Sequence, residues 1–275
     1  MLRCGKFPLS LDRPLVMGIV NVTPDSFSDG GQHASAAAAI AYAEQLIADG
    51  ADILDIGGES TRPGAAQVSE QEELDRVLPV IEGLRGISIP ISIDTWKPQV
   101  MRVALAAGAS MVNDVNALQA EGALQVAADS GAAVCLMHKQ GTPQTMQQRP
   151  EYENVMAEVS AFLSERISLA EAAGISRQRI VIDPGFGFGK TLAHNLDLLR
   201  QLEAFGALGV PVLAGLSRKS MLGAITGREV GERVAASVAA ALLAVQRGAA
   251  IVRVHDVRET VDALKILDAV NGRER

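Results

Sequence analysis

Polar and charged side chains stand at the ends of short apolar runs along this 275-residue sequence. These positions are Asn21, the segment 57–64, Asp94, Asn113, Asp183, the segment 217–220, and Arg253 with His255. A fold without a ligand site would place only one or two polar caps at such ends. Because nearly every run ends in this way, we interpret these residues as one site for a polar, charged ligand.

Two cationic segments indicate that part of this ligand is an anion. Arg253 and His255 are two residues apart in an apolar run, so they share one face of a predicted strand. Ser217 is predicted to cap a helix that has Lys219 in its first turn. Free N–H groups at a helix start suit an anion, whereas cations there oppose the helix dipole. The cations therefore indicate function rather than helix stability.

Three other patterns do not support a site of their own. Gly189-Lys190-Thr191 is similar to the end of a P-loop, but that motif requires glycine where this chain has Pro184. The glycines of residues 185–189 also miss the dinucleotide-binding pattern, and they either allow close approach to a flat ligand or form a tight loop. The four histidines lack metal-ligand spacing, so no structural zinc site is predicted.

The apolar runs predict the strands that position these residues. Eight strands are expected to begin near Leu15, Asp52, Pro90, Met111, Ala133, Ile180, Pro211 and Ala250. Each interval can hold a crossover helix, so neighbouring strands should be parallel. The pattern predicts a single-domain (β/α)8 barrel over residues 1–275, with its site at the carboxyl ends of the strands. A doubly wound open sheet is the alternative.

Capping signals predict several helix starts. Ser69 and Glu72 have the spacing of a capping box, Asp256 stands in a similar position before the last helix, and Lys97-Pro98 places proline in a first turn.

The segment Val234–Val245 is apolar or small almost all round. We expect one side of this helix to pack on the barrel and another, including Ala240, to face a second copy in a homodimer. Alternatively, alanine serves there only as a good helix former.

Composition excludes several classes of protein. A net charge of −7 argues against a general nucleic-acid or anionic-membrane binder. The longest apolar run has 12 residues, whereas a membrane span needs about 20, and the N-terminus has no secretory signal. Two cysteines are too few for a disulfide framework, and Cys135 should be a buried apolar residue. We therefore expect a cytoplasmic protein.

Eight segments carry a resemblance to a known family. They are Met17–Gly31, Asp55–Ala65, Ile93–Thr95, Asn113-Asp114, Met137-His138, Asp183–Lys190, Gly215–Ser220 and Arg253–Asp256. On these residues the sequence resembles the dihydropteroate synthases, the pterin-binding barrel enzymes of folate biosynthesis, from Val16 to about Leu267. The resemblance implies a transferase that joins para-aminobenzoate to hydroxymethyl-dihydropterin pyrophosphate and releases dihydropteroate and pyrophosphate.

The resemblance also implies roles for individual residues. Asp183 and Asn113 would bind the amino-pyrimidine edge of the pterin, Lys219 would contact its ring acceptors, and Asp94 would favour positive charge on the ring. The implied catalytic residues are Asp94, Lys219 and Arg62. The other implied substrate-binding residues are Phe27, Thr61, Pro63, Met137, Phe188, Gly215, Ser217, Arg253 and His255, of which Thr61, Arg62, Arg253 and His255 would hold the pyrophosphate. Asn21 would ligate magnesium (Mg²⁺).

Two other functions remain open at this stage. A pterin-binding methyltransferase domain shares the barrel, but the segments 60–63 and 217–220 argue against it. A non-catalytic pterin-binding paralogue would not need Phe27, Asp29, Arg62 and Pro63, which are intact. We further expect the loops 23–33 and 60–68 to become ordered when pyrophosphate and Mg²⁺ bind, which would complete the para-aminobenzoate pocket.

Overall fold

The structure is a computed structural model. It describes residues 1–23, 31–60, 67–141, 146 and 150–272, without the side chains of residues 31–35.

A parallel sheet of eight strands lies at the centre of the fold. These strands are β3 (Leu15–Asn21), β4 (Ile53–Gly57), β5 (Ile91–Asp94), β6 (Met111–Asp114), β7 (Ala133–Met137), β8 (Ile180–Asp183), β9 (Leu213–Ala214) and β10 (Ile251–Val254). Their order is β8-β7-β6-β5-β4-β3-β10-β9, and a parallel bridge between Ile182 and Val212 joins β8 to the segment leading into β9. The predicted closed (β/α)8 barrel is confirmed against the open sheet, and each of these eight strands begins within two residues of its predicted start.

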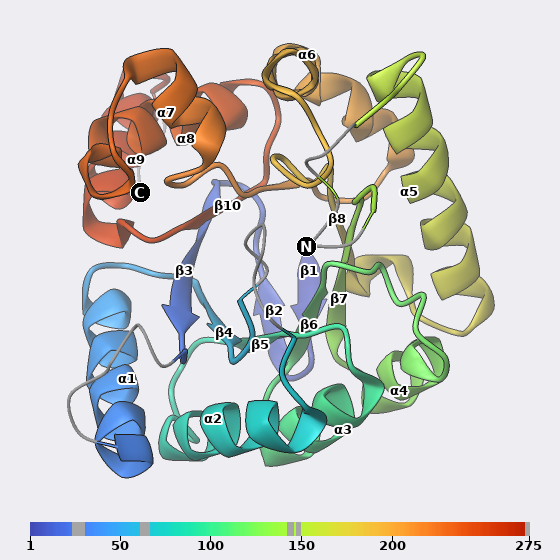
Figure 1. Cartoon of the computed structure of the whole chain (residues 1–275), viewed down its shortest axis with the longest axis vertical. Coiled ribbons are helices and arrows are strands. Elements are labelled where there is room, and N and C mark those ends of the chain that lie inside the picture. The colour runs from blue at the N-terminus through green and yellow to red at the C-terminus, as the bar shows by residue number, and fades with distance from the viewer. Residues whose placement is uncertain (24–30, 61–66, 142–145, 147–149, 273–275) are drawn as a thin grey trace.

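Helices surround the strands, as Figure 1 shows in a view that has the strands at its centre. They are α1 (Gly31–Ala48), α2 (Glu70–Gly83), α3 (Pro98–Ala107), α4 (Ala123–Ser130), α5 (Val155–Ala172), α6 (Leu192–Arg200), α7 (Ser220–Thr226), α8 (Val234–Gln246) and α9 (Val257–Val270). Short 3₁₀ segments cover Arg177–Arg179, Leu202–Leu208 and Val230–Glu232. No helix among the described residues is long and apolar enough to cross a membrane.

The strands bury both faces. Val16 and Val20 belong to the large core between strands and helices, whereas Leu15 and Met17 belong to a second cluster inside the barrel. This alternation follows from the period of two in a strand. Because both faces are buried, parallel strands have nearly continuous apolar sequences, which made them easy to predict.

An N-terminal hairpin that the sequence analysis did not predict closes the amino end of the barrel. Strands β1 (Leu2–Cys4) and β2 (Phe7–Leu9) pair antiparallel, and Gly5 turns the chain with a φ of 55°. Leu2 and Cys4 are fully buried in the cluster inside the barrel, where Cys135 also lies. Both cysteines are free thiols, and Cys135 is the buried apolar residue expected of it.

Some helix starts match the prediction, and others do not. Ser69 caps α2 by accepting the Glu72 N–H at 3.2 Å, although the Glu72 carboxylate pairs with Arg76 instead of closing a capping box. Pro98 begins α3 as predicted.

In the carboxyl-terminal third, one helix start matches the prediction and two predictions were wrong. Asp256 is the N-cap residue of α9 as predicted, although its side chain makes no capping bond because its carboxylate pairs with Arg218. Ser217 does not cap α7, which begins at Ser220 after Lys219. Ala240 does not face outward: it is 4% exposed, and the exposed side of α8 carries Leu243 instead.

Candidate active site

A buried carboxylate joins three strands at the carboxyl end of the barrel. Oδ2 of Asp55, on β4, accepts a hydrogen bond from Asn113 Nδ2 at 2.9 Å and another from Arg253 Nε at 2.6 Å. Arg253 also donates through Nη2 to Oδ2 of Asp94 at 2.6 Å. Asp55 is fully buried, and its Oδ1 has no hydrogen-bond partner in the described part of the chain. Asn113, Asp94 and Arg253 are therefore held together as predicted, by a residue to which the sequence analysis gave no role.

Asp94 and Arg253 of this cluster differ in how their charge depends on pH. Burial raises the pKa of Asp94 to about 7, with Arg253 opposing the shift and Asp55 adding to it. Burial lowers the pKa of Arg253, but the nearby Asp55 and Asp94 outweigh it and raise this pKa overall. Arg253 thus remains cationic at all ordinary pH values, whereas Asp94 can change its charge near neutrality.

Asp183 ends β8 on the opposite wall of the barrel. Its Oδ1 accepts the Gly185 N–H at 2.7 Å, and burial raises its pKa while Lys219 lowers it. Gly215 follows β9, and a Cβ atom there would lie 3.8 Å from Asp183 Oδ2 and 3.9 Å from Arg253 Cβ. The small residue at 215 therefore leaves the space between this carboxylate and Arg253 unobstructed.

Lys219 enters the same region from the loop before α7. Its ammonium group donates to the Phe186 carbonyl and lies 4.6 Å from the centre of the Phe188 ring. Burial lowers its pKa to about 8, against the attraction of Asp183. A Cβ atom at Gly187, where φ is 80°, would lie 3.2 Å from Lys219 Cδ, so a side chain there would crowd the lysine.

A protein-family model described as pterin binding enzyme matches residues 17–255. The chain belongs to this family. The dihydropteroate synthase of Neisseria meningitidis serogroup B is 53% identical, over 98% of this chain and 96% of its own length. The solved dihydropteroate synthase of Xanthomonas albilineans with 7,8-dihydropteroate is 55% identical, with a TM-score of 0.90 over 99% of both chains. The same enzyme with 4-aminobenzoic acid is 58% identical, with a TM-score of 0.91 over 97% of this chain and 96% of its own.

These relatives confirm the resemblance to dihydropteroate synthases and the transferase class that it implied. Of the remaining predicted residues, some lie outside the described part of the chain and others are described. Thr61, Arg62, Phe27 and Pro63 lie outside the described residues, as do most of the two loops expected to close. Asn21 ends β3 half-buried, and Met137 ends β7 buried, so both stand at the predicted end of the barrel.

Ser217 supports the side chain of His255. Ser217 Oγ lies 3.0 Å from His255 Nδ1 and accepts the His255 N–H at 3.2 Å. The Arg218 guanidinium pairs with Asp256, and its backbone φ is 57°. Ser217 is therefore part of the site as a partner of His255 rather than as a helix cap.

Lys190, which the sequence analysis set aside with the P-loop pattern, fixes the glycine-rich loop after β8. Its ammonium group is buried and donates to the Gly185 carbonyl at 2.9 Å and the Phe188 carbonyl at 3.0 Å. It also lies 3.0 Å from His138 Nδ1. Burial lowers the pKa of Lys190 to about 7 and that of His138 to about 3.

Two glycines of this loop are required by its own packing. A Cβ atom at Gly185 would lie 1.8 Å from the His138 carbonyl oxygen, and one at Gly189 would lie 2.4 Å from the Gln140 carbonyl oxygen. For these two glycines the structure supports the tight loop, which is one of the two interpretations left open by the sequence.

A second missed cluster holds the loop after β4. Lys97 is buried and donates to Glu59 Oε2 at 3.0 Å, to Glu73 Oε2 at 2.6 Å and to the Val68 carbonyl at 2.8 Å. Trp96 also donates to Glu59, at 3.1 Å. Glu59 and Val68, on either side of the undescribed segment 61–66, thus bind the same ammonium group. No local pattern in the sequence indicates this cluster, because the partners of Lys97 are far from it along the chain.

Proposed function

We propose that the carboxyl end of the barrel joins para-aminobenzoate to hydroxymethyl-dihydropterin pyrophosphate, giving dihydropteroate and pyrophosphate. One observation carries this assignment: Asp183, Asn113, Lys219, Asp94 and Arg253 converge on one end of the barrel, each of them buried or half-buried. The complexes of the Xanthomonas relatives with 7,8-dihydropteroate and 4-aminobenzoic acid support the choice of ligands.

The pterin ring would lie between Asp183 and Asn113. A pterin edge presents N–H groups, and a carboxylate that already has one backbone donor keeps acceptor capacity for them. Asn113 donates through Nδ2 to Asp55, which leaves its carbonyl oxygen for the ligand. Lys219 would donate to a ring acceptor, with Phe188 and Met137 against the ring faces. Leaving such buried groups unpaired costs about 1–3 kcal/mol each, so the ring is favoured over an apolar ligand.

Arg253 and His255 would bind the pyrophosphate. As the bond from the pterin methylene carbon to oxygen breaks, its electron pair leaves with the pyrophosphate, and positive charge develops on the pterin. The Asp94 carboxylate would stabilise that positive charge, and Arg253 would stabilise the leaving anion. Because the two groups touch each other at 2.6 Å, the pyrophosphate would compete with Asp94 for the guanidinium.

The amine would attack without a dedicated base. An aromatic amine is neutral at pH 7, so its nitrogen already has a free electron pair. The new C–N bond forms on the methylene carbon, and the proton then on nitrogen passes to water or to the released pyrophosphate. Thr61, Arg62, Phe27 and Pro63 remain proposed contacts of the two substrates, as does the closing of their loops.

Asn21 fits a Mg²⁺ ion that is held mainly by the substrate. Mg²⁺ usually takes one or two protein oxygens and completes its shell with water and phosphate oxygens. The carboxamide of Asn21 is half-buried at the end of β3 and makes no hydrogen bond within the described residues. When bound, the ion would neutralise charge on the pyrophosphate.

The test is product formation from the two substrates by wild type and by Asp94→Asn. We expect dihydropteroate from the wild type, dependent on Mg²⁺, and at least a hundredfold lower kcat for Asp94→Asn with little change in pterin affinity. Methyl transfer to a corrinoid, or pterin binding without product, would overturn the proposal.

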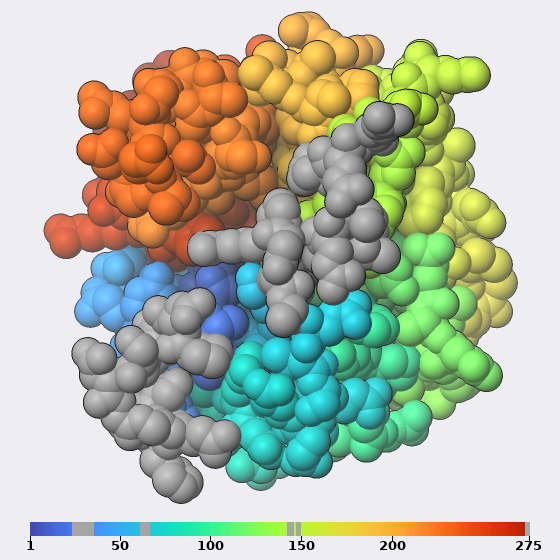
Figure 2. Space-filling view, viewed as in Figure 1, coloured from blue at the N-terminus to red at the C-terminus, as the bar shows by residue number. Residues whose placement is uncertain are grey.

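We also infer a homodimer through the exposed apolar side chains of α7, α8 and the segment between them. Ile225, Val230 and Leu243 are 56%, 47% and 40% exposed, and the two helices form one continuous surface in Figure 2. Light scattering should give twice the chain mass for the wild type and one chain mass for Leu243→Glu. A wild-type monomer would overturn it. Two buried free thiols further support a reducing, cytoplasmic location for this single domain.

A further inference from the structure

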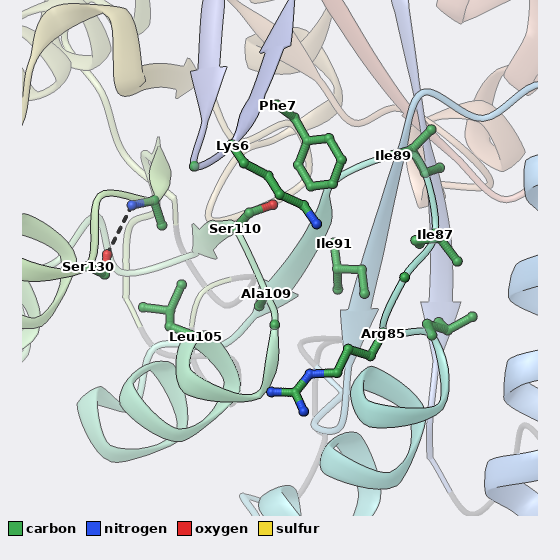
Figure 3. Close-up of a pocket in the computed structure, with 15 residues that line it drawn as sticks. Lys6, Phe7, Arg85, Ile87, Ile89, Ile91, Leu105, Ala109, Ser110 and Ser130 are labelled. Atoms are coloured by element: carbon green, nitrogen blue, oxygen red, sulfur yellow. Dashed lines mark hydrogen bonds between the residues drawn. The ribbon is translucent and has the colours of Figure 1, made fainter.

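A cavity of about 340 Å³ lies at the amino end of the barrel, away from the proposed active site. It is bounded by the turn of the β1–β2 hairpin, by the chain from the end of α2 to the start of β5, and by the end of α3 with the residues that follow it. Its lining includes Lys6, Phe7, Arg85, Ile89, Leu105 and Ser110 (Figure 3). This size is within the range of small-molecule sites.

The chemistry of the lining is asymmetric. Among the described residues that line it, the two charged ones, Lys6 and Arg85, are both cations, and none is a carboxylate. Neither side chain forms a hydrogen bond or an ion pair within the described part of the chain, although Lys6 lies 5.0 Å from the centre of the Phe7 ring. The remaining walls are mainly apolar, and three isoleucines contribute to them: Ile87, Ile89 and Ile91.

One buried polar group supports a ligand independently of the cations. Ser110 is 8% exposed, and its Oγ has no hydrogen-bond partner among the described residues. Figure 3 shows its hydroxyl on the side of the cavity that carries Lys6 and Phe7. A buried hydroxyl without a partner is unfavourable, because it has lost water and gained nothing in return. A ligand oxygen would supply the missing partner.

We propose that this cavity binds a small amphiphilic anion, a carboxylate with an apolar chain or ring. The carboxylate would lie between Lys6 and Ser110, with Arg85 adding to the positive field at the exposed rim. The apolar part would pack against Phe7, Leu105 and the isoleucines. This site would be independent of the substrate site, which lies at the opposite ends of β5 and β6.

The first test uses octanoate as the probe, with the protein saturated with dihydropteroate so that the active site is occupied. Methyl NMR spectra should show saturable shifts at Ile87, Ile89 and Ile91, and none at Ile182. Butyrate should bind at least tenfold more weakly because it fills less of the apolar wall, and octylamine should bind at least tenfold more weakly because its charge is wrong. Shifts centred on Ile182, or no saturable shift, would overturn the proposal.

Variants locate the anion. The double variant Lys6→Gln/Arg85→Gln should weaken octanoate at least tenfold, and Ser110→Ala should weaken it severalfold. The charge-matched control Arg228→Gln/Arg258→Gln removes two exposed cations elsewhere and should bind octanoate like the wild type. Synthase activity should be unchanged in all three, which shows that they fold. Equal octanoate affinity in the two double variants would mean that no specific anion site exists.

Discussion

The two ends of the barrel are built from the same strands but bury different side chains. On several strands, an inward apolar residue near the amino end is followed two positions later by an inward polar residue. Ile53 precedes Asp55, Met111 precedes Asn113, Val181 precedes Asp183, and Ile251 precedes Arg253. A period of two keeps both members of each pair facing inward. On each of these strands, a residue of the apolar interior is thus only two positions from a residue of the candidate active site.

The consequence is that the two ends should respond differently to substitution. The barrel interior near the amino end is an apolar cluster that includes Leu2 and Cys4 of the hairpin. The carboxyl end holds carboxylates and cations that are buried and depend on one another for charge balance. Removing an apolar side chain should reduce stability alone, whereas removing Arg253, which pairs with two carboxylates, should reduce both stability and activity.

Arg253→Ala should have the largest effect. It leaves Asp55 and Asp94 buried without their shared cation, and breaking a buried ion pair costs about 3–5 kcal/mol. We expect urea unfolding at pH 8 to show this loss, and we expect product formation to fall below detection. The loss should be smaller at pH 5, because burial raises the pKa of Asp94 to about 7 and this carboxyl group is protonated there.

A triple variant sharpens this prediction. Arg253→Ala/Asp55→Asn/Asp94→Asn removes the two charges as well as their partner, so stability at pH 8 should recover while activity remains absent. If the single variant is as stable as the wild type, the guanidinium is not what balances these carboxylates.

Leu2→Ala tests the other end. The side chain is fully buried in the interior cluster, and truncating such a leucine costs about 2–5 kcal/mol. For the folded variant at 20 °C, kcat and KM for both substrates should stay within twofold of the wild type. Leu169→Ala is the matched control, because that leucine is 39% exposed and should change stability far less. A large change in kcat for Leu2→Ala would show that the two ends are coupled.

Asp183→Asn should have a smaller effect, restricted to the ligand. The amide keeps the shape but presents a donor to the N–H groups of the pterin. We expect calorimetry to show at least tenfold weaker pterin binding, which corresponds to about 1.4 kcal/mol. Arg253→Lys, which keeps the positive charge, should instead weaken the pyrophosphate ester more than the free pterin alcohol. Unchanged pterin affinity in Asp183→Asn would remove this residue from the pterin edge.

The strands of the barrel could be predicted because both of their faces are buried, which gives continuous apolar runs in the sequence. The hairpin could not, since β1 and β2 have three residues each and contain Arg3 and Pro8, so Gly5 was the only local signal. Its stability comes from the barrel interior that it covers, and this is a tertiary contact.

In the site, too, residues held by tertiary contacts could not be predicted from the local sequence. Residues directly at strand ends, such as Asp94 and Asp183, could be predicted because the fold brings those ends together. Lys97 could not, because its carboxylate partners Glu59 and Glu73 are 38 and 24 residues away. Ser217 had the local pattern of a helix cap, but His255, directly after β10, engages its hydroxyl, and the helix begins three residues later.

The smallest predicted effect concerns the buried His138 beside Lys190. Burial lowers the pKa of His138 from 6.5 to about 3, with the Lys190 charge adding to this shift. Between these two pH values the unfolded chain binds a proton that the folded protein does not, so stability should fall as pH falls from 6.5 towards 3. The expected loss from His138 is about 1 kcal/mol between pH 6.5 and 5.5.

His138→Gln keeps an acceptor for Lys190 but cannot titrate, so its urea midpoint should fall less over this interval than that of the wild type. The other titratable groups are the same residues in both proteins, so the difference between the two pH profiles reports on the substitution at position 138. Parallel profiles would show that His138 is protonated in the folded protein as readily as in the unfolded chain, and that the carboxyl end tolerates this charge without loss of stability.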